Sequence, residues 1–326
     1  MMHRLLRCLF VLFAVIATFV PIVAAADTGR VPGILDVRPL GGQQYQVVVY
    51  SAAMKRPITL WVSHPDRPAP TLYLLNAVDG GEDGGPWNVR TDAARFFADK
   101  PVNVVVPIGG RASYYTDWTS DDPALGRNEW STFLIRELPP LLNARFHATG
   151  RNAVAGVSMS GTSALDLAIE APGMYQAAGV YSGCPSTSDP ASRALVYSQL
   201  ATFGANAANM WGGPTNAAWS AHDPVVNAAR LRGVALYISS GNGSAGVHDT
   251  LADPSIGGNP LTLANRLSIG GAMENVVNGC TRALTGRLAA LGIPATEVFH
   301  AGTHSWPYWQ DDLHHSWPVF AAALGV

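Results

Sequence analysis

Short apolar segments alternate with helical patterns along most of the chain, and this alternation is the feature that most restricts its fold. The expected strands span 44–54, 56–64, 71–78, 102–110, 152–158, 175–184, 233–243 and 295–306; the expected helices span 91–100, 128–146, 163–172 and 272–292. The later strands are apolar on both faces, which is typical of a parallel sheet covered by helices on both sides. The first two strands are expected to be antiparallel. The sequence therefore predicts an α/β fold with a mainly parallel sheet.

One long segment, residues 185–232, interrupts this alternation. It is rich in Ala, Asn and Trp and has no regular period. Because it lies between two expected sheet strands, it should sit near the carboxyl ends of the strands, where lids and substrate walls are found. No internal repeat or linker divides the chain. We therefore expect one domain that carries an insertion around 185–232.

The beginning of the chain has the pattern of a secretory signal peptide. Arg4 and Arg7 precede an apolar run at 8–20, and three alanines at 24–26 provide a cleavage site. An uncleaved membrane anchor is the alternative, but the apolar run is shorter than the roughly 20 residues of a spanning helix. We expect residues 1–26 to be a signal peptide and residues 27–326 to be an exported catalytic domain, secreted or held at the cell envelope.

Charge and cysteine content fit an exported globular protein. The formal net charge is −2, and loss of Arg4 and Arg7 with the signal peptide makes it more negative by two, which argues against nucleic-acid binding. Of the three cysteines, Cys8 lies in the signal peptide, and Cys184 and Cys280 remain. An even pair in an exported chain predicts one disulfide, with two buried thiols as the alternative.

The stretch "GVSMSG" (156–161) resembles the Gly-x-Ser-x-Gly signature of a nucleophilic serine, with Ser160 in place of the last glycine. It lies between an apolar strand and a helix, as a nucleophile elbow does in the α/β-hydrolase fold. Ser158 would stand at the apex, and the amide of Met159, at the start of the helix, would be one oxyanion donor. The alternatives are an ordinary strand–helix turn with a serine cap, or Ser160 or Ser163 as the reactive serine.

A nucleophilic serine needs a base, which in this fold follows the last strand. His304 in "GTHSW" occupies that place, whereas His300 is expected to pack at a strand end, and the other late histidines, His314 and His315, to be solvated or to cap a terminal helix. The acid is less defined. Asp249 and Glu274 are both candidates to orient the histidine, and spacing slightly favours Asp249.

Five stretches together resemble the secreted mycolyltransferases of the antigen 85 type, particularly the corynebacterial-type members. They are "LYLLNAVDGGEDGGPWNVRTD" (72–92), "YYTDWTSDDPALGRNEWSTFLIRELP" (114–139), "GVSMSGTSALDLAI" (156–169), "AMENVVNGCTRAL" (272–284) and "GTHSWPYWQDDL" (302–313). The resemblance implies an α/β-hydrolase fold with a Ser–Glu–His triad. Carried over by position, Ser158 is the nucleophile, His304 the base and Glu274 the acid, which outweighs the spacing argument for Asp249.

The resemblance also implies a second oxyanion amide at Val78. The chain departs from the family at residues 76–79, where Asn-Ala-Val-Asp replaces Asp-Gly-Leu-Arg, so that a cationic sugar contact becomes a carboxylate. We expect substrate contacts at Asn76, Asp117 and Trp306. Most of the other aromatic residues near these stretches are expected in the core; they are Trp87, Tyr115, Trp118 and Trp130.

A bond between Cys184 and Cys280 would pin the helix of Glu274 to the sheet beside the nucleophile. The implied activity is transfer of a mycolyl group from trehalose monomycolate to a sugar hydroxyl, on a second trehalose monomycolate or on cell-wall arabinan, through an acyl-enzyme. This chemistry needs no metal or cofactor. A secreted carboxylesterase and a non-catalytic binding protein of the same fold are the alternatives.

Overall fold

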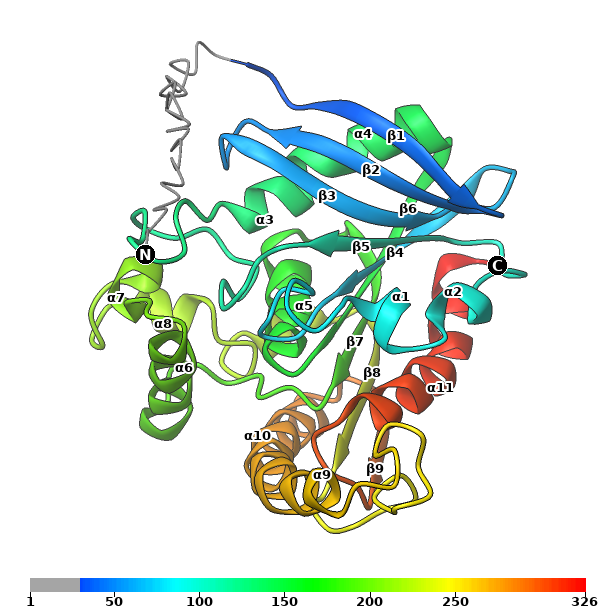
Figure 1. Cartoon of the computed structure of the whole chain (residues 1–326). Coiled ribbons are helices and arrows are strands. Elements are labelled where there is room, and N and C mark those ends of the chain that lie inside the picture. The colour runs from blue at the N-terminus through cyan, green and yellow to red at the C-terminus, as the bar shows by residue number, and fades with distance from the viewer. Residues whose placement is uncertain (1–29) are drawn as a thin grey trace, which may run out of the picture. The chain divides into compact units, whose positions relative to one another are not determined.

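The computed structural model describes residues 30–326, so the predicted signal peptide lies outside the described residues. Residues 31–326 form one compact unit built on a single sheet (Figure 1). In this part of the chain the strand order is β1-β2-β3-β5-β4-β6-β7-β8-β9. β1, β2 and β3 are antiparallel to their neighbours. The remaining strands, in the order β5-β4-β6-β7-β8-β9, run parallel to one another. The mainly parallel sheet predicted from the sequence is confirmed.

The strands follow the apolar runs of the sequence closely. Their bounds are β1 Gly33–Gly41, β2 Gln44–Ser51, β3 Arg56–Ser63, β4 Ala69–Leu75, β5 Asn103–Ile108, β6 Ala148–Val157, β7 Tyr175–Tyr181, β8 Ala235–Gly241 and β9 Thr296–His300. β4 is buried along its whole length. Only β1 was missed, because most of its side chains are exposed and it has no apolar alternation to reveal it.

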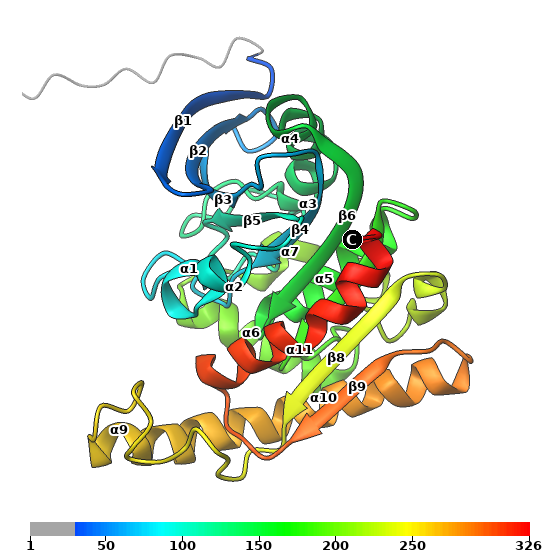
Figure 2. The same cartoon turned by 90° about the vertical axis from the view of Figure 1, so that its right-hand side faces the viewer.

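Helices cover both faces of the sheet. Their bounds are α1 Trp87–Arg90, α2 Ala93–Phe96, α3 Trp130–Thr132, α4 Leu138–Phe146, α5 Met159–Glu170, α6 Pro190–Thr202, α7 Ala207–Trp211, α8 Ala218–Ala221, α9 Pro260–Asn265, α10 Gly271–Ala290 and α11 Trp306–Leu324. One buried cluster joins the sheet to α4, α5 and α10, and a second joins it to α1, α2 and α11. Figure 2 shows α10 and α11 on opposite sides of β8. Among the described residues, no helix combines the length and apolar character needed to cross a bilayer.

Two predicted helices differ from the structure. The helix expected at 91–100 is a single turn, α2, and the side chain of Lys100 donates a hydrogen bond to the carbonyl of its last residue, Phe96. The helix expected at 128–146 contains a π-helical segment, η1 (Phe133–Glu137), between α3 and α4. Pro139 and Pro140 follow one residue later, after Leu138, and neither has an N–H to complete the regular helical pattern.

The segment between β7 and β8 is more ordered than its sequence suggests. It forms α6, α7, α8 and a 3-10 turn, η2 (Ala228–Leu231), and the three helices lie together at the left of Figure 1. Asp189 and Asn206 start α6 and α7 by accepting hydrogen bonds from the first helical amides. Trp211 and Trp219 pack edge to face, with ring centroids 5.2 Å apart, and belong to the same buried cluster as α5 and the sheet.

Candidate active site

Ser158 lies at a sharp turn between β6 and α5. Its backbone has φ 54° and ψ −122°, a conformation that a residue with a side chain rarely adopts. The crossing of strand and helix requires glycine at two positions. A Cβ at Gly156 would collide with the carbonyl oxygen of Ser160, and a Cβ at Gly161 would lie 2.9 Å from the Cα of Gly183. The local sequence therefore forms a nucleophile elbow.

Ser160, at the altered position of the motif, has a defined structural contact. It is fully buried, and its hydroxyl accepts a hydrogen bond from the amide of Val157 at 2.9 Å. The same oxygen lies 3.1 Å from the carbonyl oxygen of Leu75, at the end of the neighbouring strand β4. The extra hydroxyl therefore links two strands beneath the elbow, and its packing leaves the apex serine as the residue that faces the cavities.

Three side chains far apart in the sequence meet at this turn. His304 Nε2 lies 2.8 Å from the Oγ of Ser158, and His304 Nδ1 lies 2.6 Å from Oε2 of Glu274. The ring of His304 packs edge to face on Trp309, with centroids 4.8 Å apart. The histidine can therefore accept a proton from the serine while the carboxylate holds its other nitrogen.

Glu274 is completely buried on α10, and its second oxygen is held by three donors. Oε1 accepts hydrogen bonds from Ser182 Oγ at 2.7 Å, Ser240 Oγ at 3.0 Å and the amide of Gly241 at 2.6 Å. Burial alone would raise the pKa of Glu274, but the hydrogen bond and charge of His304 and the two serine hydroxyls lower it overall. The carboxylate therefore stays ionised and oriented.

The other candidate acid, Asp249, does not contact His304. Its oxygens accept hydrogen bonds from Thr303 Oγ1 and Tyr308 Oη, each at 2.7 Å, and from the amide of Gly246 at 2.9 Å. It fastens the loop before His304 instead of touching the ring. The preference from spacing was wrong because distance along the chain does not determine which carboxylate the fold brings to the histidine.

The other late histidines have partners of their own. The ring of His300 stacks on Tyr308, and its Nε2 lies 3.5 Å from Asp312. Burial would lower the pKa of His300, but Asp312 raises it to about 9. His314 was expected to be solvated or capping, yet it stacks on Phe96 and bonds Asp92. The structure therefore brings His304 to the elbow serine.

Two cavities meet at Ser158. The first, about 560 Å³, is lined mostly by apolar groups from α5, α6 and α10, including Met159, Leu195, Val196 and Val277. The second, about 820 Å³, has a mixed lining in which charged and aromatic groups stand among apolar ones; because it is the more polar of the two, we call it the polar cavity. Its lining residues that carry charge or a ring are Asp79, Arg90, Phe203, His248, Asp253, Arg266, His304, Trp306 and Trp309. Ser158 thus stands between an apolar cavity and a more polar one.

Both residues expected to supply oxyanion amides line a cavity, Met159 the apolar one and Val78 the polar one. Met159 is the first residue of α5, so its amide has no acceptor within its own helix. Val78 lines the polar cavity, and its carbonyl accepts a hydrogen bond from the amide of Ala112 at 2.8 Å, which fixes the loop after β4.

Two residues that we expected to contact substrate, Asn76 and Asp117, do not line either cavity in the structure. Asn76 is fully buried, and its amide donates to the carbonyl of Pro107 at 2.7 Å and accepts from the amide of Trp87. Asp117 accepts hydrogen bonds from the amide and hydroxyl of Thr132 and holds the start of the α3 region. Both satisfy backbone groups and do not line either cavity, whereas Trp306 does line the polar one.

The sequence did not single out Arg90, Arg266 or His248 in the polar cavity, because separate basic residues on loops and helices carry no recognisable pattern. The expected core aromatics, Trp87, Tyr115, Trp118 and Trp130, are at most 5% exposed.

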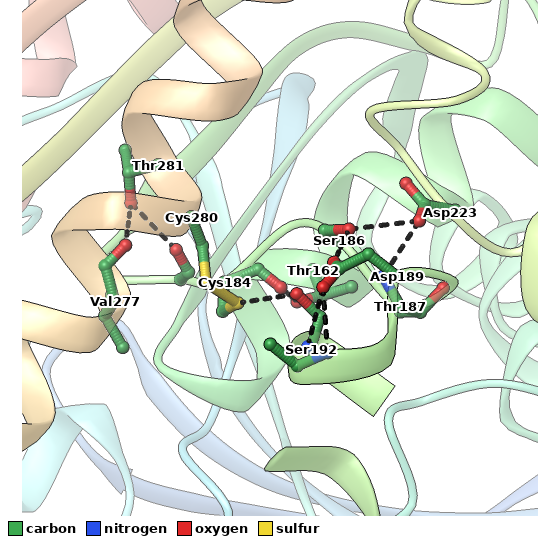
Figure 3. Close-up of a disulfide and its surroundings, with 12 residues drawn as sticks. Thr162, Cys184, Ser186, Thr187, Asp189, Ser192, Asp223, Val277, Cys280 and Thr281 are labelled. Atoms are coloured by element: carbon green, nitrogen blue, oxygen red, sulfur yellow. Dashed lines mark hydrogen bonds between the residues drawn. A yellow bond between two sulfur atoms is a disulfide. The ribbon is translucent and has the colours of Figure 1, made fainter. Parts of the chain in front are cut away.

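A disulfide joins Cys184 to Cys280 (Figure 3). Beside it, the hydroxyl of Thr281 donates to the carbonyls of Gly183 and Val277, each at 2.9 Å. These contacts attach α10 to the segment after β7, which also holds the acid through Ser182. The expected pairing of the two cysteines is present.

The fold and the elbow define a member of the α/β-hydrolase class. The family model described as "Putative esterase" matches residues 51–319. The chain is 32% identical over 288 residues to the Mycobacterium leprae protein "Diacylglycerol acyltransferase/mycolyltransferase Ag85A", covering 85% of this chain and 82% of that protein. It is 30% identical to the Ag85B protein of Mycobacterium intracellulare, covering 94% of each. The chain therefore belongs to the antigen 85 mycolyltransferase family.

Solved structures agree with this assignment. The Mycobacterium tuberculosis protein MPT51 (FbpC1) matches with a TM-score of 0.71 and 26% identity, covering 87% of this chain and all of that one. An S-formylglutathione hydrolase from Agrobacterium tumefaciens matches with a TM-score of 0.63 at 16% identity, covering 90% and 99%. The second match shows the shared fold alone. Together the relatives support an acyltransferase or esterase-like activity.

Proposed function

We propose that this protein is an exported serine acyltransferase that moves a mycolyl group from trehalose monomycolate to a sugar hydroxyl. The observation that carries the proposal is the continuous chain Glu274–His304–Ser158, with the serine at the meeting point of an apolar and a polar cavity. The names of the relatives suggest the acyl group.

In the proposed first half-reaction, Ser158 Oγ attacks the ester carbonyl while His304 Nε2 takes the hydroxyl proton. Glu274 stabilises the imidazolium, and the amides of Met159 and Val78 donate to the oxyanion. Collapse of the tetrahedral intermediate breaks the ester bond, and His304 gives the proton to the departing sugar oxygen. The acyl chain then remains on the serine as an ester.

In the second half-reaction, an acceptor hydroxyl enters the polar cavity and attacks the acyl-enzyme carbonyl while His304 removes its proton. The bond from the acyl carbon to Ser158 Oγ then breaks, and His304 returns the proton to that oxygen. The apolar cavity suits an alkyl chain because its lining offers few hydrogen-bonding partners. The polar cavity suits a sugar, because arginine, histidine and carboxylate groups alternate with the rings of Trp306 and Trp309. Arg90 and Arg266 supply cations there, while Asp79 stands where relatives of this type have arginine.

The test is incubation of the purified protein with trehalose monomycolate, followed by measurement of trehalose dimycolate and free mycolate. Dimycolate as the main product supports transfer; free mycolate alone would make the protein an esterase. Ser158→Ala should abolish both products and labelling by a serine-reactive phosphonate. Ser163→Ala is the matched control, since that buried serine of the same helix donates to the Tyr114 carbonyl and should keep most of the activity. A wild-type protein that resists the phosphonate and forms neither product would be a binding protein.

Export is part of the same proposal. Mass spectrometry of protein recovered from the culture medium or envelope should give a mature chain that begins at Asp27. Retention of residues 1–26 would indicate an uncleaved anchor instead.

A further inference from the structure

Three side chains that commonly bind metal ions lie together at the far end of α5 from Ser158. Asp166 and Glu170 belong to α5, and His222 directly follows α8 in the insertion. His222 Nδ1 lies 2.8 Å from Oδ2 of Asp166 and 3.1 Å from Oε1 of Glu170. One ligating atom from each residue lies within 4.8 Å of the other two, a spacing that no other such trio in residues 30–326 shares.

The helix and the insertion together create this cluster. Asp166 and Glu170 are four residues apart, so one face of α5 carries two carboxylates that repel each other unless a cation lies between them. His222 is held over them because its ring stacks flat on Trp211, with centroids 4.8 Å apart and planes 3° apart. The three groups are therefore held in place by secondary structure and ring stacking.

Asp166 also has a buried oxygen, Oδ1, without a hydrogen-bond partner in the described structure, on the same carboxylate as the oxygen that faces His222. The residue is only 5% exposed. A buried carboxylate oxygen without a partner is costly. Burial raises the pKa of Asp166 to about 6, although His222 and, at longer range, Arg230 act to lower it. A second cationic partner at this oxygen would remove the penalty.

We propose that Asp166, Glu170 and His222 form a binding site for a divalent transition-metal ion such as Zn²⁺. Nitrogen and carboxylate ligands lie about 2.0–2.2 Å from zinc, so tetrahedral ligands stand about 3.3 Å apart. The separations of His222 Nδ1 from the two carboxylate oxygens, 2.8 and 3.1 Å, need to open by only a few tenths of an ångström, and the three ligand atoms lie within 4.8 Å of one another. Asp166 can turn Oδ1 toward the ion, and water would complete the coordination, because Glu170 and His222 are partly exposed.

A proton competes with the metal ion for Nδ1 of His222. Burial alone would lower the pKa of His222, but its hydrogen bonds to Asp166 and Glu170 raise it to about 10. Without metal, the protonated ring therefore bridges the two carboxylates. Metal binding must release that proton, which weakens the affinity but does not alter the identity of the ligands.

The bound ion would fasten the insertion to the helix that begins at the elbow. Trp211, beneath His222, contacts Tyr114 at a centroid distance of 6.1 Å, and Tyr114 lines the apolar cavity. The site would be structural, because its three ligands are not among the residues that border either cavity at Ser158. This inference does not depend on the proposed acyl transfer.

The test uses the full-length mature protein after treatment with EDTA and dialysis. Isothermal titration with ZnCl₂ in a mildly alkaline buffer should show one ion per chain, and the melting temperature should rise with zinc concentration. Co²⁺ in place of zinc should give visible absorption bands. His222→Gln and Asp166→Asn should each weaken zinc binding by at least about tenfold. His315→Gln, which removes an exposed histidine elsewhere, should bind as the wild type does.

Each variant is compared with its own metal-free form, so a change in basal stability does not obscure the result. A wild-type protein that binds no zinc and shows no change in melting temperature would overturn the proposal and leave a protonated ion-pair cluster. Unchanged zinc binding in His222→Gln would also overturn it, by placing the ion elsewhere.

Discussion

Replacing Glu274 with glutamine tests the proposed catalytic machinery most directly, because the surroundings of this side chain determine how an amide must orient. Oε1 accepts three hydrogen bonds, from Ser182, Ser240 and the amide of Gly241. The glutamine carbonyl must take that position, since an NH₂ group there would face the backbone donor. The amide NH₂ is then directed at Nδ1 of His304.

This orientation reverses the proton arrangement of the histidine. Nδ1 must accept a hydrogen bond from the new amide, so the ring proton moves to Nε2, which lies 2.8 Å from Ser158 Oγ. A protonated Nε2 cannot remove the serine proton. Amide substitution of a triad acid in this geometry costs about 10⁴ in kcat, which corresponds to about 5.4 kcal/mol of activation free energy.

The assay is the initial rate of acyl transfer from trehalose monomycolate, with phosphonate labelling as a second readout and a thermal melt to show that the variant is folded. Asp249→Asn is the matched control. It replaces a similarly buried acid that contacts the loop but not the ring, so we expect a loss of tenfold or less. If Glu274→Gln keeps more than about a tenth of the activity, or if Asp249→Asn loses as much, the assignment of the acid is wrong.

Three further predictions concern stability. Ser160→Ala leaves the Val157 amide without its acceptor and should lower the free energy of unfolding by about 1–3 kcal/mol, measured by urea denaturation; an unchanged midpoint would contradict the role of the hydroxyl. Removing the disulfide by Cys184→Ala with Cys280→Ala opens a link between residues 96 apart and should cost about 2–5 kcal/mol, so a double variant as stable as the wild type would refute it. The lowered pKa of Glu274 means that its stabilisation is complete above the unfolded-state pKa and is lost as pH falls through the folded-state pKa. The difference in unfolding free energy between the wild type and Glu274→Gln should therefore shrink between pH 7 and pH 3, and a constant or growing difference would contradict this sign.

Local sequence patterns were sufficient to predict those strands and turns whose geometry requires particular residue types at neighbouring positions. The burial of β4 and of residues 153–157 in β6 requires apolar side chains on both faces, so these segments were visible as apolar runs, whereas the polar, exposed start of β6 was not. The elbow was also recognisable, because the close approach of strand and helix demands small residues around Ser158. β1 lies at an exposed edge and has no such requirement, and it was missed.

The polar residues show where sequence reasoning fails. Asn76 and Asp117 stand beside recognisable motifs, and their polarity suggested contacts with substrate. In the structure their hydrogen-bonding capacity is used by backbone groups of neighbouring segments. A side chain that satisfies a buried amide and one that meets a ligand look the same in a sequence, because the partner is specified only when the chain has folded.

The sequence by itself determined the mainly parallel sheet, the family and the positions of the candidate serine and histidine, because each depends on short-range spacing or on matching stretches. The family resemblance already implied Glu274 as the acid; the tertiary structure decided how that carboxylate is held against the histidine, where the two cavities lie, and how the insertion brings His222 to Asp166 and Glu170. These features join residues tens of positions apart, and hydrogen bonds and ion pairs form only when packing reduces such separations to about 3 Å.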